Sequence, residues 1–236
     1  WYPSGSLHSM SIGVNAARFT GNSYEGEGED INLHYNKLSP FVKLTLKERS
    51  ALSKKESWIR MRSFFFREDG LSFNTIIDGA DTTYTTGKLS AGRSLQQLTL
   101  YTADHRALYP YEMDLNIDVN NQFTRIAFTG QYFFNYGTKK KGLSTRFFAG
   151  KFIYHGAATT AKQLETERYH LNLTGANGYE DYTYSNYFTG RNEYSGWKSQ
   201  QIMMRDGGFK TRTDLLSSKI GKTDDWLAAI NLNADI

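Results

Sequence analysis

The sequence of 236 residues predicts an all-β protein, an antiparallel transmembrane β-barrel of about 10–12 strands. Many segments of roughly ten residues alternate apolar and polar side chains, which is the pattern of strands whose two faces meet different surroundings. The chain is rich in aromatic residues, with 16 Tyr, 15 Phe and 4 Trp, yet its mean hydropathy is −0.57. No run of about 18 apolar residues occurs, so a transmembrane helix is excluded on length.

The clearest alternation covers three successive segments. Apolar side chains occupy the odd positions of Tyr109–Val119 and the even positions of Ile126–Phe134. A helical period of 3.6 residues would mix the two sets, so these segments are predicted strands. Asn120 and Asn121 between them suit a tight turn. A third strand follows the Gly137–Gly142 turn, with an aromatic face and an opposite face carrying Lys and Ala. The aromatic face comprises Phe148, Gly150, Phe152 and Tyr154, and the opposite face Ala149 and Lys151.

Weaker alternation on both sides of this region predicts further strands. Their apolar faces are Met10 to Ala16, Ile31 to Tyr35, Val42 to Leu46, Ile59 to Phe65, Leu98 with Leu100, and Trp226 to Ile236. The parity of the apolar positions changes between Tyr35 and Leu38, which predicts a bulge or two separate strands there. Long loops are predicted where Gly, Asn, Ser and acidic residues concentrate, at Gly21–Asp30, Arg67–Gly92 and Thr174–Arg205. Shorter links are predicted at Lys47–Ser57, Ala103–Ala107 and Lys139–Lys141.

A soluble β-sandwich has the same alternation with inside and outside exchanged, so periodicity alone leaves both architectures open. Three features favour lipid: an aromatic girdle at strand ends, small residues within apolar faces, and charges such as Arg60 with Arg62 on the opposite faces. The expected girdle comprises Tyr109, Tyr111, Phe123, Tyr132, Phe134, Tyr136, Tyr154, Tyr169 and Trp226. In a barrel Phe148, Phe152, Ile230 and Leu232 would face lipid, and in a sandwich they would form the core.

Several kinds of chemistry are excluded or left without support. With no cysteine the chain has no thiolate zinc site and no thiol nucleophile. The net charge of +4 is small and evenly mixed, which speaks against nucleic-acid binding. None of the five histidines belongs to a His-Glu-x-x-His motif. We therefore predict no catalytic, cofactor-binding or metal-binding residue, and we expect that the chain is not itself an enzyme.

Two acidic segments of the sequence are candidates for cation sites. Asp114–Asn120 places oxygen ligands at alternate positions, but Val119 stands where a calcium loop needs Gly and Arg125 where it needs Glu. A polar strand face is the better interpretation. The acidic run Glu25–Asp30 could attract a divalent cation, although such runs are usually solvated loops.

Tyr187–Lys210 has the unusual sequence YFTGRNEYSGWKSQQIMMRDGGFK, and Asp224–Leu232 follows as DDWLAAINL. These two stretches resemble the C-terminal barrel region of large Bacteroidota membrane proteins that carry a thermolysin-like zinc aminopeptidase domain upstream. The resemblance implies an outer-membrane barrel that anchors a peptidase domain made by another part of the polypeptide. The family's zinc motif has no counterpart here, so no catalytic residue is carried over. The resemblance also implies further strands beyond Ile236. We therefore expect this chain to be part of a longer polypeptide and the barrel to be incomplete at its C-terminal end.

These observations predict a single barrel domain over residues 1–236 in a bacterial outer membrane. Its expected role is an anchor or scaffold, with the lipid bilayer and lipopolysaccharide as surroundings and outer-membrane or periplasmic subunits as protein partners. One alternative is a channel for a small or apolar solute, with a lumen lined by Arg60, Arg62, Glu112 and Asp114. The other is a soluble β-sandwich that binds glycans through exposed aromatic residues of Tyr179–Trp197.

Overall fold

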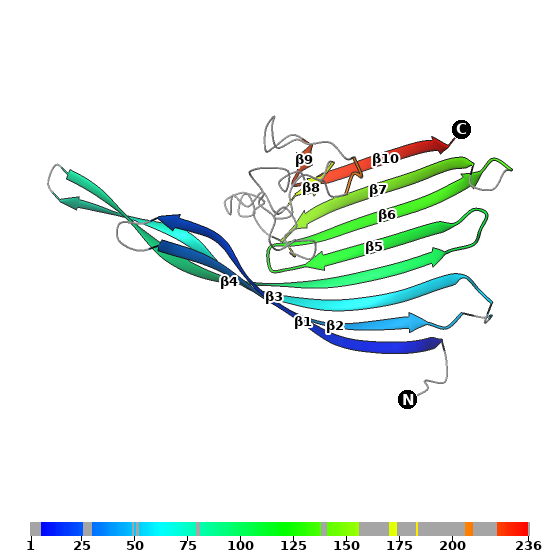
Figure 1. The fold of residues 1–236 in the computed structure, drawn as a ribbon, viewed down its shortest axis with the longest axis horizontal. Helices are drawn as coiled ribbons and strands as arrows, with labels where there is room; N and C mark the ends of the chain where they lie inside the picture. The colour runs from blue at the N-terminus through cyan, green and yellow to red at the C-terminus, as the bar shows by residue number, and fades with distance from the viewer. Residues whose placement is uncertain are drawn as a thin grey trace. The chain divides into compact units, whose positions relative to one another are not determined.

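The computed structural model describes residues 6–25, 30–48, 50, 52–78, 81–137, 141–155, 170–173, 183, 206–209 and 221–235. These residues form ten strands and no helix, which confirms the all-β prediction. Eight strands form one sheet in the order β1-β2-β3-β4-β5-β6-β7-β10, and β8 pairs with β9 in a second sheet (Figure 1). Within the described residues β1 and β10 are the two edges of the large sheet.

The strand bounds show where the long and short strands lie. The strands are β1 Leu7–Glu25, β2 Asp30–Leu46, β3 Lys55–Asp78, β4 Asp81–Asp104, β5 Tyr111–Val119, β6 Phe123–Asn135, β7 Gly142–Tyr154, β8 Leu171–Asn172, β9 Lys222–Thr223 and β10 Trp226–Asp235. By contacts the chain divides into two compact units. Unit 1 comprises Trp1–Ser11, Val42–Met61 and Gln97–Ile236, and unit 2 comprises Ile12–Phe41 and Arg62–Gln96.

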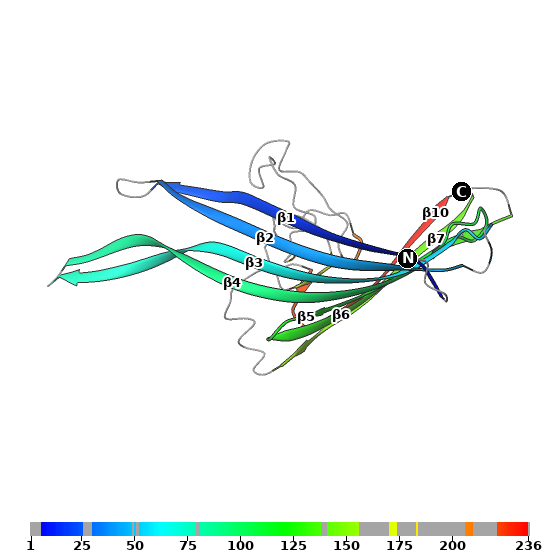
Figure 2. The same ribbon diagram turned by 90° about the horizontal axis from the view of Figure 1, so that it is seen from below.

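In unit 1, β5, β6, β7 and β10 are neighbouring antiparallel strands, seen from a second direction in Figure 2. The hairpin predicted around Asn120 is confirmed, and the side chain of Asn120 closes its turn. The Asn120 side-chain oxygen accepts hydrogen bonds from the backbone N–H groups of Gln122 and Phe123, at 2.8 and 2.7 Å. Among the described non-glycine residues only Tyr109, before β5, has a positive φ, of 57°. A side chain that imitates backbone therefore closes this hairpin.

The two faces of this part of unit 1 have opposite character. Register fixes the faces: Met113 is opposite Gly130, Gly130 opposite Phe147, and Phe147 opposite Ile230. We call the face with these side chains the outer face and the opposite one the inner face. Large apolar side chains exposed on the outer face are Met113, Val119, Ile126, Phe134, Phe147, Ile153, Trp226, Ile230 and Leu232. The inner face carries the buried side chains Asp118, Phe123, Ala127, Phe148, Phe152 and Ala229.

The register corrects one predicted face. Ile230 and Leu232 are 59% and 64% exposed on the outer face, whereas Phe148 and Phe152 are 1% and 2% exposed on the inner face. The prediction that these four residues share a face is wrong. Phe147 pairs with Ile230, so its neighbour Phe148 must point the other way. An aromatic face of a strand therefore does not by itself identify the outside of the sheet.

The predicted girdle is corrected in the same way. Tyr132 and Phe134 lie together on the outer face with ring centroids 4.4 Å apart, and Trp226 is exposed there. Phe123 is fully buried on the inner face, where its ring meets Phe152 edge-on at 5.0 Å. Tyr154 is on the inner face because it pairs with Phe123. Tyr169 lies outside the described residues.

In unit 2 the strands replace two predicted loops. Most of Arg67–Gly92 lies in β3 and β4, each of 24 residues, and β1 and β2 contain both ends of Gly21–Asp30. The sequence of these segments lacks a regular apolar alternation, so pairing with neighbouring strands sets their conformation. The predicted break between Tyr35 and Leu38 is also absent, because β2 is one strand. Tyr35 is buried and Leu38 is exposed because they project from opposite faces.

Cations cover the aromatic side chains of unit 2. The Arg93 guanidinium lies 3.9 Å from the centroid of the Phe66 ring and forms an ion pair with Glu68, Nη2 to Oε1 2.8 Å. The Lys37 ammonium lies 5.2 Å from the centroid of the Phe64 ring. Phe64 and Phe66 are both buried. The long basic side chains therefore cover ring surface while also carrying charge.

Candidate functional site

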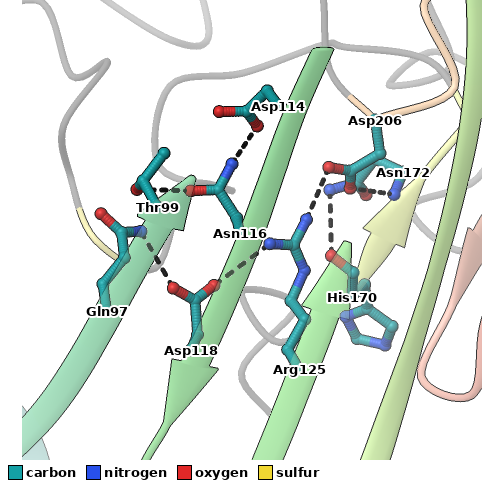
Figure 3. Close-up of polar contacts among 9 residues, drawn as sticks. All are labelled: Gln97, Thr99, Asp114, Asn116, Asp118, Arg125, His170, Asn172 and Asp206. Carbon is teal, nitrogen blue, oxygen red and sulfur yellow. Dashed lines mark hydrogen bonds and ion pairs between the residues drawn. The ribbon is translucent and has the colours of Figure 1, made fainter. Parts of the chain in front are cut away.

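The inner face of unit 1 carries a connected network of polar side chains. Asp118 of β5 lies opposite Arg125 of β6, and β4 adds Gln97 and Thr99 (Figure 3). Gln97 Nε2 donates to Asp118 Oδ1 at 2.9 Å, and Thr99 Oγ1 donates to Asn116 Oδ1 at 2.8 Å. Asn116 also donates from its side-chain nitrogen to the Asp114 carboxylate. Alternation explains the grouping, since residues two apart in β5 share a face.

Arg125 holds the centre of the network. Its Nη1 lies 3.1 Å from Asp118 Oδ2, and its Nη2 lies 2.7 Å from Asp206 Oδ1. The side chains of Arg125 and Asp206 are each 12% exposed, and that of Asp118 is 1% exposed. One arginine thus bridges two carboxylates away from water. Removing one partner would leave a buried charge uncompensated, which is far more costly than losing a surface pair.

Asp206 fixes a small structure against the inner face. We call segments 170–173, 206–209 and 221–223 the cap. Asp206 Oδ2 accepts a hydrogen bond from the backbone N–H of Asn172 at 2.9 Å, and Gly207 N–H donates to the Asn172 carbonyl at 2.8 Å. Leu173 accepts from Phe209 N–H at 3.2 Å and donates to the Gly221 carbonyl at 2.7 Å. Backbone hydrogen bonds therefore join the three segments into one unit.

The cap is bound to the strands beneath it. Arg146 of β7 donates from Nη1 to the Asp206 carbonyl at 2.9 Å, in addition to the Arg125 ion pair. Tyr154 donates from its hydroxyl to the Asp224 carbonyl, and Phe152 N–H donates to the Asp225 carbonyl at 2.7 Å. These contacts connect β7 to the turn that leads from the cap into β10. The cap consequently lies on the same face as the buried charges.

Two adjacent glycines allow this close approach. A Cβ on Gly207 would lie 2.4 Å from the Leu173 carbonyl oxygen. Gly208 has φ +78°, and a Cβ there would lie 2.5 Å from Arg146 Nη1 and 2.6 Å from Asn231 Oδ1. Any larger residue would have to displace these groups, and at Gly208 it would also be strained. The Asp206-Gly207-Gly208 sequence is therefore shaped for its position in the cap.

Of the residues considered from the sequence as a lumen lining, Arg60 and Glu112 lie close enough to Asp114 for their charges to interact with its carboxylate. Asp114, Asn116 and Asp118 form a polar strand face with Arg125, which confirms the interpretation preferred over a calcium loop. Arg60 lies against the ring of Trp58 in unit 1, with 5.1 Å to its centroid, and Arg62 lies against Phe41 and Phe64 in unit 2. Residues 26–29 of the acidic run, Lys139 and Lys140, and Tyr179–Trp197 apart from Thr183 lie outside the described residues.

No group of three or more His, Cys, Asp or Glu side chains placed to hold a metal occurs among the described residues. The described part of the chain also contains no long apolar helix of the kind that crosses a membrane. Sequence reasoning missed Asp206, Asn172 and Arg146. The one local sign was the Asp-Gly-Gly sequence, since Asp206 and Arg125 are 81 residues apart and no spacing rule joins them.

Comparison of the chain with protein-family models, with curated protein sequences and with solved structures finds no match. The site must therefore be interpreted from its own geometry.

Proposed function

We propose that this chain forms part of the wall of a bacterial outer-membrane β-barrel that serves as an anchor or scaffold. The observation that carries the proposal is the difference between the two faces of unit 1: the exposed face is apolar, and the buried face carries an ion-pair network beside buried aromatic side chains. Trp226, 62% exposed, shares the outer face with Ile230 and Leu232, whereas the Arg125 ion pairs lie within. Water would favour the reverse arrangement, because large exposed apolar patches are rare on soluble monomers. A hydrocarbon layer favours the observed one.

Strand lengths and end residues support the same proposal. β5, β6, β7 and β10 have 9, 13, 13 and 10 residues, close to the roughly 9–11 that a tilted transmembrane strand needs. Tyr132 and Phe134 lie near the β6–β7 turn, and Trp226 begins β10. Aromatic residues at strand ends suit the two membrane interfaces. Lys151 pairs with Trp226 on the outer face, where its long stem would let the ammonium reach the interface.

The packed inner face favours an anchor over an open channel. The Asp118–Arg125–Asp206 network and the cap occupy the side that would face the lumen. Charges of opposite sign pair with one another there and leave little room for a diffusing solute. In a bilayer every edge must be paired, so the proposal requires further strands beside β1 and β10, from the same polypeptide or from another chain.

The resemblance to Bacteroidota barrels suggests what is anchored. We infer a peptidase domain elsewhere in the same polypeptide, with no catalytic residue contributed by this chain. Outer-membrane or periplasmic subunits would be further partners, and bilayer lipid with lipopolysaccharide would surround the wall. The network residues would then serve stability and closure.

Fractionation and heat-modifiable migration of the natural polypeptide test the proposal. We expect recovery in the outer-membrane fraction, a requirement for detergent, and different migration of unboiled and boiled samples. A monodisperse β-rich protein in detergent-free buffer, with identical migration before and after boiling, would overturn it. In that case glycan binding by a soluble β-protein becomes the leading hypothesis.

A further inference from the structure

We propose that Lys151, Trp226, Thr124 and His155 form a site on the outer face of unit 1 for a phosphate group of lipopolysaccharide. The inference rests on the proposed membrane function, because the site meets lipid only if this face contacts a bilayer. It goes beyond that function in two respects. It assigns one class of lipid to named residues, and it assigns one end of the strands to the outer leaflet.

Lys151 is the charged residue of an otherwise uncharged surface. Of the positions that the registers of β5, β6, β7 and β10 place on the outer face, only Lys151 carries a charged side chain. The side chain is exposed, and within the described part of the chain it forms no ion pair. An ammonium on a surface that meets hydrocarbon needs an anionic partner, because an unpaired charge is costly there. Lipid phosphates are the anions available at the edge of a bilayer.

Neighbouring residues supply further groups that bind phosphate oxygens. In the register Lys151 lies between Ile126 of β6 and Trp226 of β10, and Trp226, 62% exposed, has an indole N–H. Farther toward the strand end, Thr124 Oγ1 and His155 Nε2 are hydrogen-bonded at 2.7 Å in an exposed position. An ammonium, an indole, a hydroxyl and an imidazole can all donate hydrogen bonds. Hydrogen bonds from a cation to a phosphate are among the stronger ones.

The nearest carboxylates interact with groups of the inner face. Asp224 and Asp225 come directly before β10, and their charges act on the Tyr154 hydroxyl. Tyr154 is on the inner face, and so is Asp118, which is 1% exposed and ion-paired there. On the outer face the positive charge of Lys151 therefore has no carboxylate beside it among the described residues, and the surface favours an anion.

The surface beside the site suits hydrocarbon chains. Ile126, Phe147 and Ile230 are exposed on the outer face, on the side of Lys151 that leads away from the strand end. A lipid whose phosphate binds Lys151 can lay its acyl chains along these side chains. The long stem of Lys151 keeps the ammonium at the level of the headgroup, as is usual for lysine near a membrane interface.

The strand connections indicate the leaflet. Lys151 lies near the end of β7 from which the longest connection of the chain leads to β10 (Figure 1). At the opposite end β6 and β7 are joined by a short turn. Outer-membrane barrels have short periplasmic turns and longer extracellular loops. The site thus belongs to the outer leaflet, where lipopolysaccharide is the phosphate-bearing lipid of a Gram-negative outer membrane.

Native mass spectrometry of the natural polypeptide in detergent, titrated with deep-rough lipopolysaccharide, tests the site. Lys151→Gln removes the charge, and Lys141→Gln makes the same change at an exposed position just before the other end of β7. We expect Lys151→Gln to raise the apparent Kd at least about fivefold, because a charge-assisted hydrogen bond is lost. Lys141→Gln and Lys151→Arg should stay within about twofold of the wild type, since both keep a cation at residue 151.

Two further ligands identify the recognised group on the wild type, so the test stays decisive if Lys151→Gln folds poorly. Lipopolysaccharide whose phosphates have been removed enzymatically should bind at least about fivefold more weakly than the intact form. Phosphatidylglycerol at equal concentration should not displace intact lipopolysaccharide.

Each contrary result has a distinct meaning. Equal affinity of the wild type and Lys151→Gln, in samples with the same heat-modifiable migration, would overturn the site and leave the membrane function standing. Equal binding of intact and dephosphorylated lipopolysaccharide would also overturn the site, because phosphate would not be the recognised group. Displacement by phosphatidylglycerol would overturn the assignment to lipopolysaccharide. A polypeptide that needs no detergent and shows no heat-modifiable migration overturns the proposed function together with the site.

Discussion

Replacing Ile230 by arginine tests whether the outer face of unit 1 contacts lipid, at a position in the middle of β10. Ile230 is the fifth of ten residues in β10 and lies in one row with Phe147, Gly130 and Met113 across the outer face. If this row lies near the bilayer midplane, Ile230→Arg should cost about 2–4 kcal/mol of folding stability. Because each 1.4 kcal/mol is a factor of ten, the unfolding equilibrium should shift by roughly 30- to 700-fold.

The same substitution has a very different expectation in water. At a position 59% exposed to solvent, arginine should change stability by no more than about 0.5 kcal/mol. Asn233→Arg is the matched control, since Asn233 is exposed on the opposite face of the same strand. It should stay within about 0.5 kcal/mol of the wild type under either hypothesis.

Reversible urea unfolding in phospholipid vesicles, followed by tryptophan fluorescence, measures both variants. The lipid-facing interpretation requires a loss for Ile230→Arg that exceeds the loss for Asn233→Arg by about 2 kcal/mol or more. Equal midpoints for the two variants would refute the assignment of the outer face to lipid.

Three further predictions concern the inner face and the turns. Arg125→Met should cost about 3–5 kcal/mol in the same urea assay, because two buried carboxylates lose their cation, and a loss below about 1 kcal/mol would show that water reaches them. Gly208→Ala should lower the urea midpoint more than Gly137→Ala. Both glycines have a positive φ, but of the two only Gly208 has other atoms where a Cβ would lie. Equal losses for the two variants would contradict the geometry of the cap. Hydrogen bonds from Arg106 lower the pKa of Asp104, the last residue of β4. The Asp104 carboxylate therefore contributes to folding stability above about pH 4, and this contribution is lost as the pH falls through the lowered pKa. The urea midpoint should therefore fall less in Asp104→Asn than in the wild type between pH 6 and about pH 2, and parallel pH profiles would refute this assignment.

The sequence predicted strands well where one face is consistently apolar. Tyr111–Val119 and Trp226–Asp235 lie in strands as expected, because alternation over about ten residues has no helical explanation. It failed for Arg67–Gly92, where Gly, Asp and Ser indicated a loop. β3 and β4 are consecutive strands that lie side by side in the sheet, and their pairing, which no alternation of apolar residues marks, determines the conformation there.

For a related reason, local patterns in the sequence could not predict which face each strand residue occupies or which residues form the polar network. Phe148 and Phe152 have the composition of a lipid face, but the register with β6 and β10 turns them toward Arg125 and the cap. A one-residue change of register would exchange the faces, and composition does not fix register when both faces carry aromatic residues. The Arg125–Asp206 pair depends on the fold of the whole unit, so only the structure brings its members together.

Depth-resolved spin labelling of single cysteines measures whether the outer face of unit 1 contacts lipid, and the chain has no native cysteine to remove. Labels at Phe147 and Ile230 would report on the outer face, and a label at Asn233 on the opposite one. In vesicles we expect the labels at Phe147 and Ile230 to collide with oxygen and to be shielded from a water-soluble nickel complex, and we expect the label at Asn233 not to be shielded from the nickel complex. Free access of the nickel complex to labels at Phe147 and Ile230 would contradict a lipid-facing outer face and would favour the hypothesis of a soluble β-protein.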